Sequence, residues 1–247
     1  MKTVLFCGGR GTRIRDNPEN LPKPLVPVNG KPIVRHIMDY YTAYGADEFI
    51  LTLGYRADAF YDYFSGSNGL KPDHDHPHTT LVDTGLDITI AERLHAVRDR
   101  LRNEEFFCAN YSDVLTNAPL DEMIEQFRAS NKVACFLSVP LPTSFHFVNT
   151  ARDGSVRSIE RSASMDLWIN GGYFLLRPEV FNYIEPGDEL VERPFARMIE
   201  DNALMSWRHT GFWRPMDTQA ERRILEGMAQ NGVYPWEQRP KKEKVAS

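Results

Sequence analysis

Val4-Leu5-Phe6-Cys7-Gly8-Gly9-Arg10-Gly11-Thr12-Arg13 is a short apolar run that enters a turn with three glycines, and Leu21-Pro22-Lys23-Pro24-Leu25 follows it. The apolar run predicts a buried strand, and the turn after it carries two arginines. Backbone N–H groups can approach an anion closely at glycine. Arginine and lysine supply charge that matches phosphate oxygens. The stretch therefore predicts a site for a nucleoside triphosphate at the end of a strand.

Two common phosphate-binding loops do not fit this turn. A dinucleotide fingerprint needs a third glycine, but Gly9-Arg10-Gly11-Thr12-Arg13 is followed by Ile14. A Walker loop needs a glycine followed by Lys-Ser or Lys-Thr, which this turn lacks. Taken alone, the glycines could form a flexible surface turn, and Lys23 could be a solvated loop lysine. The prolines on both sides of Lys23 restrict the backbone and favour an aimed ammonium group.

The length suits one large α/β domain or a domain with a small appendage, and the composition is that of a globular protein. The chain has 247 residues, of which 42% are hydrophobic and 26% charged. Its net charge of −5 gives no overall positive field for nucleic acid. The cysteines, Cys7, Cys108 and Cys135, lie in apolar runs and indicate buried free thiols in a reducing compartment. With no apolar stretch of membrane-spanning length and no signal-peptide pattern, we expect a cytoplasmic protein.

Strand and helix patterns alternate through the first half of the chain, which predicts a mostly parallel sheet of the α/β class. From about Ser144 the pattern changes to a hairpin and a longer strand. The predicted strands are 4–7, 49–53, 80–82, 106–109, 133–139, 145–148, 156–159, 168–176 and 204–207. The predicted helices are 32–44, 56–64, 93–101, 120–127, 178–183, 194–202 and 222–228.

Two aspartates are candidate metal ligands. Asp113 closely follows the strand 106–109, and ligands of an open parallel sheet bind beyond the carboxyl ends of its strands. The glycine-rich turn lies beyond the same end of its own strand. Magnesium prefers one or two carboxylates together with phosphate oxygens. Asp113 is therefore the first candidate and Asp217, at a strand-to-helix junction, the second, although each could be an ordinary turn or N-cap aspartate.

Other charged groups leave more than one interpretation open. Arg93 could be the first residue of a solvated helix, or it could point from the helix towards a nucleotide. The stretch Asp73–His78 could suggest a metal site, but its spacing suits a polar surface loop better. The sequence has no G-x-S-x-G and no sign of a cysteine nucleophile, so covalent hydrolase chemistry is not supported.

Taken together and in order, these motifs resemble those of the sugar-phosphate nucleotidyltransferases, most of all the glucose-1-phosphate cytidylyltransferase branch. The matches run from the N-terminus to Trp236 and are jointly specific. They are G-G-x-G-T-R at 8–13, P-K-P at 22–24, G-K-P-I at 30–33, H-I-M at 36–38, G-Y at 54–55, Y-F at 63–64, L-V-D-T-G at 81–85, R-L at 93–94, I-N-G-G-[YF]-F at 169–174 and G-F-W-x-P-M-D-T at 211–218.

The resemblance implies a Rossmann-like, mainly parallel sheet flanked by helices, the nucleotidyltransferase or glycosyltransferase-A-like fold. It implies one domain over residues 1–240, with a nucleotide-binding part at about 1–140 and a small β-rich sugar-phosphate-binding part at about 141–240. The lysine-rich residues 241–247 are expected to be a disordered tail. A homo-oligomer is possible.

The resemblance also implies the reaction and its residues. A sugar 1-phosphate oxygen attacks the α-phosphorus of a nucleoside triphosphate, with CTP and glucose 1-phosphate expected, to give a nucleotide-sugar and pyrophosphate. Such catalysis is mostly positioning and charge neutralisation. The implied catalytic residues are Arg13, Lys23 and Asp113, and Mg²⁺ is held by Asp113 and Asp217. The implied nucleotide-binding residues are Gly8, Gly9, Arg10, Gly11, Thr12, Arg13, Lys23, Thr84, Arg93 and Ser112; those for the sugar phosphate are Glu160, Arg161, Asn170, Gly171 and Gly172.

Three departures from the family pattern keep alternatives open. Glu160-Arg161-Ser162 replaces the usual E-K-P, and arginine differs from lysine in reach and geometry. Ser112-Asp113-Val114 replaces G-D-G, and the segment between Phe64 and Leu81 is shorter than in the cytidylyltransferase branch. The alternatives are another nucleotide, an unusual phosphorylated acceptor, or a catalytically inactive nucleotide-binding regulatory protein.

Overall fold

The computed structural model describes residues 1–11, 21–66, 78–142, 145–161 and 166–237. Outside these ranges lie the predicted site residues Thr12 and Arg13, Ser162 and the predicted tail. Most of the stretch 73–78 also lies outside them. Within the described ranges, no helix combines the length and apolar character needed to cross a lipid bilayer.

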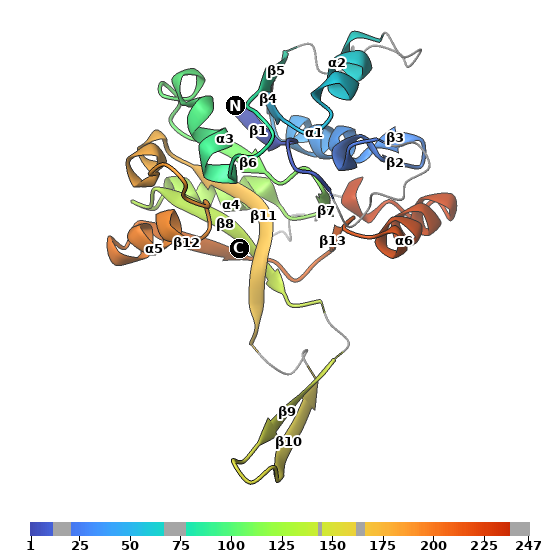
Figure 1. Cartoon of the computed structure of the whole chain (residues 1–247), viewed down its shortest axis with the longest axis vertical. Coiled ribbons are helices and arrows are strands. Elements are labelled where there is room, and N and C mark those ends of the chain that lie inside the picture. Colours follow the sequence, from blue (N-terminus) through green and yellow to red (C-terminus); the bar gives the residue numbers. More distant parts are fainter. Residues whose placement is uncertain (12–20, 67–77, 143–144, 162–165, 238–247) are drawn as a thin grey trace, which may run out of the picture.

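A seven-stranded sheet forms the centre of the protein (Figure 1). Its strands lie in the order β12-β8-β11-β6-β1-β4-β5. All neighbours are parallel except β11, which is antiparallel to both β6 and β8. The predicted mixed, mainly parallel sheet is therefore confirmed. The strands are β1 Lys2–Phe6, β4 Glu48–Leu53, β5 Thr79–Asp83, β6 Phe107–Asn110, β8 Ala134–Pro140, β11 Trp168–Leu176 and β12 Leu204–Arg208.

Helices cover both faces of this sheet. Because side chains alternate along a strand, β1 sends Leu5 into one buried cluster and Val4 and Phe6 into another. The first cluster is covered by α1 Ile33–Ala43, α2 Ala57–Ser65, α4 Leu120–Arg128 and α6 Gln219–Gln230. The second is covered by α3 Ile90–Ala96 and α5 Arg193–Glu200. Both faces of the sheet are thus buried, as a parallel sheet requires.

Two helices begin earlier than the sequence predicts because a capping box forms at their N-terminus. Thr89 and Glu92 form a capping box, so α3 begins at Ile90 instead of residue 93 and ends at Ala96 before a 3₁₀ helix over Arg98–Arg100. Thr218 and Glu221 form a second capping box, so α6 begins at Gln219 instead of residue 222. The segment Pro178–Tyr183 is a 3₁₀ helix.

Short strand pairs that the sequence did not indicate flank the main sheet. β2 Pro27–Val28 pairs with β3 Lys31–Pro32, and β7 Val114–Thr116 pairs with β13 Trp213–Pro215. The second pair matters for the site because Asp113 directly precedes β7 and Asp217 closely follows β13. It therefore joins two segments that are far apart in the sequence.

The hairpin predicted after Ser144 is present as β9 His146–Thr150 and β10 Val156–Arg161. It extends away from the main sheet as a two-stranded ribbon (Figure 1). Glu160 and Arg161, at the end of β10, are both exposed. The two residues implied for the sugar phosphate thus belong to this ribbon.

Candidate active site

A cleft with a volume of about 230 Å³ opens beyond the carboxyl ends of β1 and β6. This is the edge at which open α/β sheets bind their ligands. The cleft brings together residues from both halves of the chain. It is lined by Phe6, Gly9, Gly11, Lys23, Pro24, Tyr111, Asp113 and Asp217.

Lys23 joins the two predicted metal ligands at this cleft. Its Nζ donates a hydrogen bond of 2.6 Å to Asp113 Oδ2 and another to Asp217 Oδ1. The side chains are 12%, 22% and 29% exposed for Lys23, Asp113 and Asp217. Burial lowers the pKa of Lys23, but the two carboxylates outweigh it and raise the pKa above its usual value. Lys23 is therefore cationic at neutral pH.

Local backbone structure fixes the position of Lys23. The residue begins a 3₁₀ helix over Lys23–Leu25, in which Leu25 N donates to Pro22 O at 2.8 Å. Pro22, Pro24 and Leu25 are buried, so the turn is anchored on both sides of Lys23. Because proline restricts the backbone around Lys23, only the side chain retains freedom.

Asp113 and Asp217 are positioned by the β7–β13 pair. Met216 N donates to Asp113 O at 2.9 Å, which ties the start of β7 to the residue before Asp217. Asp217 N in turn donates to Glu221 Oε2 at 2.7 Å, beside the capping box of α6. The second carboxylate is thus held at a helix start, but it also faces the cleft.

The two aspartates fit a magnesium site. One carboxylate oxygen from each lies within hydrogen-bonding distance of the same Nζ, so both point at one small region. Magnesium is typically held by one or two carboxylates and completes its shell with water and substrate phosphate oxygens. Across the described ranges there is no cluster of three or more Asp, Glu, His or Cys residues suited to a metal.

Arg93 is buried, so the interpretation as a solvated helix residue is wrong. Its side chain is 3% exposed, and its Nη1 donates to Leu53 O, Thr84 Oγ1 and Gly85 O at 2.7–2.9 Å. Its Nη2 donates to Gly8 O at 3.2 Å and to Leu86 O at 3.0 Å. Arg93 therefore connects the glycine-rich turn to the end of β4 and to the loop after β5.

Ser112 and Thr84 also turn their hydroxyls inward. Ser112 is fully buried, and its Oγ accepts a hydrogen bond from Cys7 Sγ at 3.4 Å. Thr84 Oγ1 donates to Leu53 O at 2.7 Å. Burial raises the pKa of Cys7 to about 12, so this thiol is protonated. The nucleotide contacts expected of Ser112, Thr84 and Arg93 stay predictions.

The remaining residues of the turn differ in their surroundings. Gly8 is buried, and a Cβ added to it would lie 2.1 Å from Arg93 Nη1. Gly9 is exposed, with no atom within 4 Å of an added Cβ. Gly11 has a φ of 54°, a conformation that favours glycine. Arg10 pairs with Asp87 at 2.6 Å and is not among the residues that line the cleft.

Asn170 connects the cleft to a neighbouring hollow. Its Nδ2 donates to Tyr111 Oη at 3.2 Å, and its Oδ1 accepts from Gly172 N at 2.9 Å. Gly172 has a φ of 77° and packs against Tyr111, while Gly171 O accepts from Trp213 Nε1 at 2.9 Å. The hollow has a volume of about 380 Å³ and is lined by Phe136, Ser138, Trp168, Ile169, Asn170, Val191, Phe195, Ser206 and Arg208.

The sequence analysis did not single out Phe6 or Tyr111, which both line the cleft. Each lies at the carboxyl end of a strand, Phe6 in β1 and Tyr111 just after β6, which is a signal that could have found them. Conversely, Glu160 and Arg161 lie on the hairpin and line neither the cleft nor the hollow.

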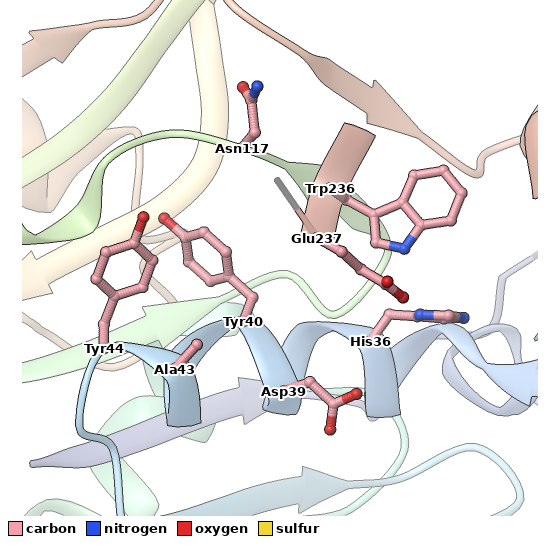
Figure 2. A pocket seen from close by; sticks show the side chains of 8 residues that line it. All are labelled: His36, Asp39, Tyr40, Ala43, Tyr44, Asn117, Trp236 and Glu237. Carbon is pink, nitrogen blue, oxygen red and sulfur yellow. The ribbon is translucent and has the colours of Figure 1, made fainter. Parts of the chain in front are cut away.

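A third pocket, of about 370 Å³, lies between α1 and the 3₁₀ helix over Pro235–Glu237 (Figure 2). The face of α1 that bears His36 and Tyr40 forms one wall together with Tyr44, which directly follows the helix, and Trp236 lies opposite it. The hydroxyls of Tyr40 and Tyr44 both donate to Ala118 O. None of the predicted site residues lines this pocket, so its size does not make it the candidate active site.

The chain matches a family model described as nucleotidyl transferase over residues 2–211. It is 33% identical to the probable glucose-1-phosphate cytidylyltransferase of Bacillus subtilis (strain 168), covering 96% of this chain and 99% of that one. It is 32% identical to the glucose-1-phosphate cytidylyltransferase of Salmonella typhimurium, covering 96% and 98%. A probable mannose-1-phosphate guanylyltransferase of Arabidopsis thaliana is 28% identical, covering 92% of this chain and 64% of that one.

Solved structures share the fold. A putative glucose-1-phosphate thymidylyltransferase from Bacillus anthracis, in complex with a sucrose, superposes with a TM-score of 0.71 at 17% identity and covers 94% of this chain and 96% of that one. A UTP-bound UGPase from Acinetobacter baumannii gives a TM-score of 0.71 at 15% identity and covers 95% of each chain. From the family match and from relatives above 30% identity over nearly the whole chain, we conclude that this chain belongs to the nucleotidyl transferase family and is a nucleotidyltransferase.

Proposed function

We propose that this protein transfers a cytidylyl group from CTP to a sugar 1-phosphate, with glucose 1-phosphate as the first candidate, and releases pyrophosphate. The observation that carries the proposal is the convergence of Lys23, Asp113 and Asp217 at one cleft beside Gly9 and Gly11. A cation and two carboxylates around a glycine-rich turn suit a triphosphate and its metal. A plain phosphate-binding surface would have no use for the two carboxylates.

The proposed roles of the predicted site residues are as follows. Backbone N–H groups of the turn hold the triphosphate, and Lys23 neutralises the α-phosphate as the acceptor oxygen attacks. Asp113 and Asp217 hold Mg²⁺, which when bound neutralises charge on the phosphate oxygens. Arg13 holds the departing pyrophosphate. Arg93 keeps the turn and the loop after β5 in register through its hydrogen bonds to Gly8 and Gly85.

The acceptor side is proposed to lie at Asn170 and the hollow beside it. Asn170 contacts Tyr111, which lines the cleft, so the two spaces adjoin at this pair. The hollow has an aromatic wall at Trp168, polar groups at Ser138 and Ser206, and the guanidinium of Arg208 stacked 4.6 Å from the Trp168 ring centre. A phosphorylated sugar needs a cation for its phosphate and both polar and apolar surfaces for its ring. Glu160 and Arg161 reach this substrate only if the hairpin takes another position or a second copy supplies them.

The choice of CTP rests on the relatives. The relatives described above that exceed 30% identity over nearly the whole of both chains are named cytidylyltransferases. A guanylyltransferase relative is less similar and is a longer protein, of which the match covers 64%. The proposal therefore names CTP first and keeps GTP, UTP and dTTP as alternatives for the same chemistry.

The test is pyrophosphate release with Mg²⁺, in which CTP, UTP, dTTP, GTP and ATP are each combined with several sugar 1-phosphates. We expect the highest kcat/KM with CTP and glucose 1-phosphate. If another nucleotide and sugar 1-phosphate gave the highest kcat/KM, the proposed reaction type would stand and the proposed substrates would change. Absence of release with every pair, while CTP still binds in calorimetry, would contradict the proposed activity and favour a regulatory nucleotide-binding protein.

A further inference from the structure

We propose that Lys23 is a built-in counter-cation: in the ligand-free protein its ammonium group occupies the place between Asp113 and Asp217 that a divalent cation would take. Metal binding at the pair then requires Lys23 to leave it. The lysine that leaves is the one that meets the triphosphate in the same cleft. This inference rests on the proposed function only in taking the pair as the metal site.

The contacts of Lys23 carry the first step. A single Nζ donates to one oxygen of each carboxylate. Asp113 directly precedes β7 and Asp217 closely follows β13, two strands that are distant in the sequence. Two partly buried carboxylates aimed at one point repel each other unless a cation lies between them. In the ligand-free protein the Lys23 ammonium is that cation, and the Lys23 side chain is only 12% exposed.

The second step is that the Lys23 ammonium and a divalent cation cannot both lie between Asp113 and Asp217. Magnesium binds carboxylate oxygens at about 2.1 Å and demands near-octahedral geometry. Lys23 uses Asp113 Oδ2 and Asp217 Oδ1, the oxygens that converge on the gap between the two side chains. With both cations in that gap, like charges would lie within a few ångströms of each other in a partly buried site. Occupancy by Lys23 and occupancy by the metal are therefore mutually exclusive.

The third step is that the Lys23 side chain can leave the two aspartates and contact a triphosphate in the same cleft. The backbone of Lys23 is held between Pro22 and Pro24 in an anchored 3₁₀ turn, so the exchange involves side-chain rotation alone. Lys23 lines the cleft together with Gly9 and Gly11. A triphosphate bound at the turn would offer the ammonium a second set of anionic partners. Nucleotide and metal should thus bind cooperatively, because each makes the release of Lys23 less costly for the other.

The test measures metal binding and needs no turnover. Mn²⁺ is titrated into the full-length protein without nucleotide and followed by electron paramagnetic resonance. The variants are Lys23→Met, Lys23→Met with Asp217→Asn, Asp113→Asn, and Lys132→Met. Lys132 is the matched control because it binds Asn202 and is not among the residues that line the candidate active-site cleft. Circular dichroism verifies the fold, and Lys23→Gln replaces Lys23→Met if the latter fails to fold.

We expect Lys23→Met to bind Mn²⁺ at least about tenfold more tightly than the wild type, which corresponds to about 1.4 kcal/mol. The double variant should lose this gain, and Lys132→Met should match the wild type. Adding CTP should tighten Mn²⁺ binding to the wild type more than to Lys23→Met. Equal Mn²⁺ affinity in the wild type and Lys23→Met would overturn the exchange while the activity proposal stands. If Asp113→Asn bound Mn²⁺ in the presence of CTP as tightly as the wild type does, the assignment of the metal site itself would be overturned.

Discussion

Met216 N donates a hydrogen bond of 2.9 Å to Asp113 O, and this contact brings the two acidic residues of the site together. Asp113 precedes β7, Asp217 follows Met216, and the β7–β13 pair holds both segments in register. Each aspartate alone is a common turn or helix-start residue. They form a candidate metal site because the β7–β13 pair brings their two carboxylates close together.

The first prediction concerns Asp113 itself. Asp113→Asn keeps the size of the side chain but removes its charge, so we expect kcat to fall by about two to four orders of magnitude, as for loss of a group that stabilises transition-state charge. The fold should persist, which circular dichroism and thermal unfolding can verify. Asp99→Asn, at an exposed aspartate paired with Arg102, is the matched control and should retain wild-type kcat.

The second prediction compares two adjacent glycines. A Cβ at Gly8 would lie 2.1 Å from Arg93 Nη1, whereas a Cβ at Gly9 meets no atom within 4 Å. Gly8→Ala should therefore lower the free energy of unfolding by about 1–3 kcal/mol through overpacking. Gly9→Ala should change it by less than about 1 kcal/mol. Urea denaturation of both variants measures the difference, and equal stabilities would contradict the close packing of Arg93 on Gly8.

The third prediction concerns backbone conformation at Ser112. Its φ is 66°, in the left-handed region that favours glycine, and its side chain is fully buried. Ser112→Gly and Ser112→Ala both remove the hydroxyl that accepts from Cys7. They differ in their tolerance of this φ, so the glycine variant should be the more stable by about 1 kcal/mol. If the alanine variant proved equally stable in urea, the positive φ would not describe the protein in solution.

The fourth prediction is a pH dependence of stability that arises from His36. Burial lowers the pKa of His36 to about 4, and the neighbouring charge of Lys31 acts in the same direction. A histidine with a depressed pKa in the folded state stabilises the fold above its unfolded pKa of about 6.5, and this contribution is lost as the pH falls towards 4. The unfolding free energy should drop by up to about 3 kcal/mol over this range.

His36→Gln is the variant that checks this pH effect. His36 Nε2 lies 3.1 Å from Val28 O, and the glutamine amide can also donate a hydrogen bond to a carbonyl oxygen. Between pH 6.5 and 4.5 the variant should lose less stability than the wild type in urea denaturation. A parallel loss in both proteins would assign the pH dependence to other groups.

Much of the fold could be predicted from the sequence because its signals are local. Apolar runs identified the strands of the main sheet, and Pro32 and Gly45 marked the ends of α1. α3 begins three residues before the predicted start because the capping box of Thr89 and Glu92, and not the apolar spacing, sets its first turn. β7 and β13 were missed because three-residue strands have no periodicity and are stabilised by their partner across the chain.

The candidate site was predictable in its parts and not in its arrangement. Glycines, Lys23, Asp113 and Asp217 are residue types that phosphate and metal chemistry require, so they could be selected from motifs. The ion pairs among Lys23, Asp113 and Asp217 depend on β7 meeting β13, which no local pattern encodes. Arg93 was ambiguous for the same reason, since its acceptors lie on the turn after β1, the end of β4 and the loop after β5.

The most direct test of the central claim is ³¹P NMR of a reaction that contains the protein, CTP, glucose 1-phosphate and Mg²⁺. We predict that pyrophosphate and a nucleoside diphosphate sugar form in equimolar amounts, and that the rate falls to background in Asp113→Asn. Consumption of CTP with no loss of the glucose 1-phosphate signal, or the same product formation in Asp113→Asn, would contradict the account.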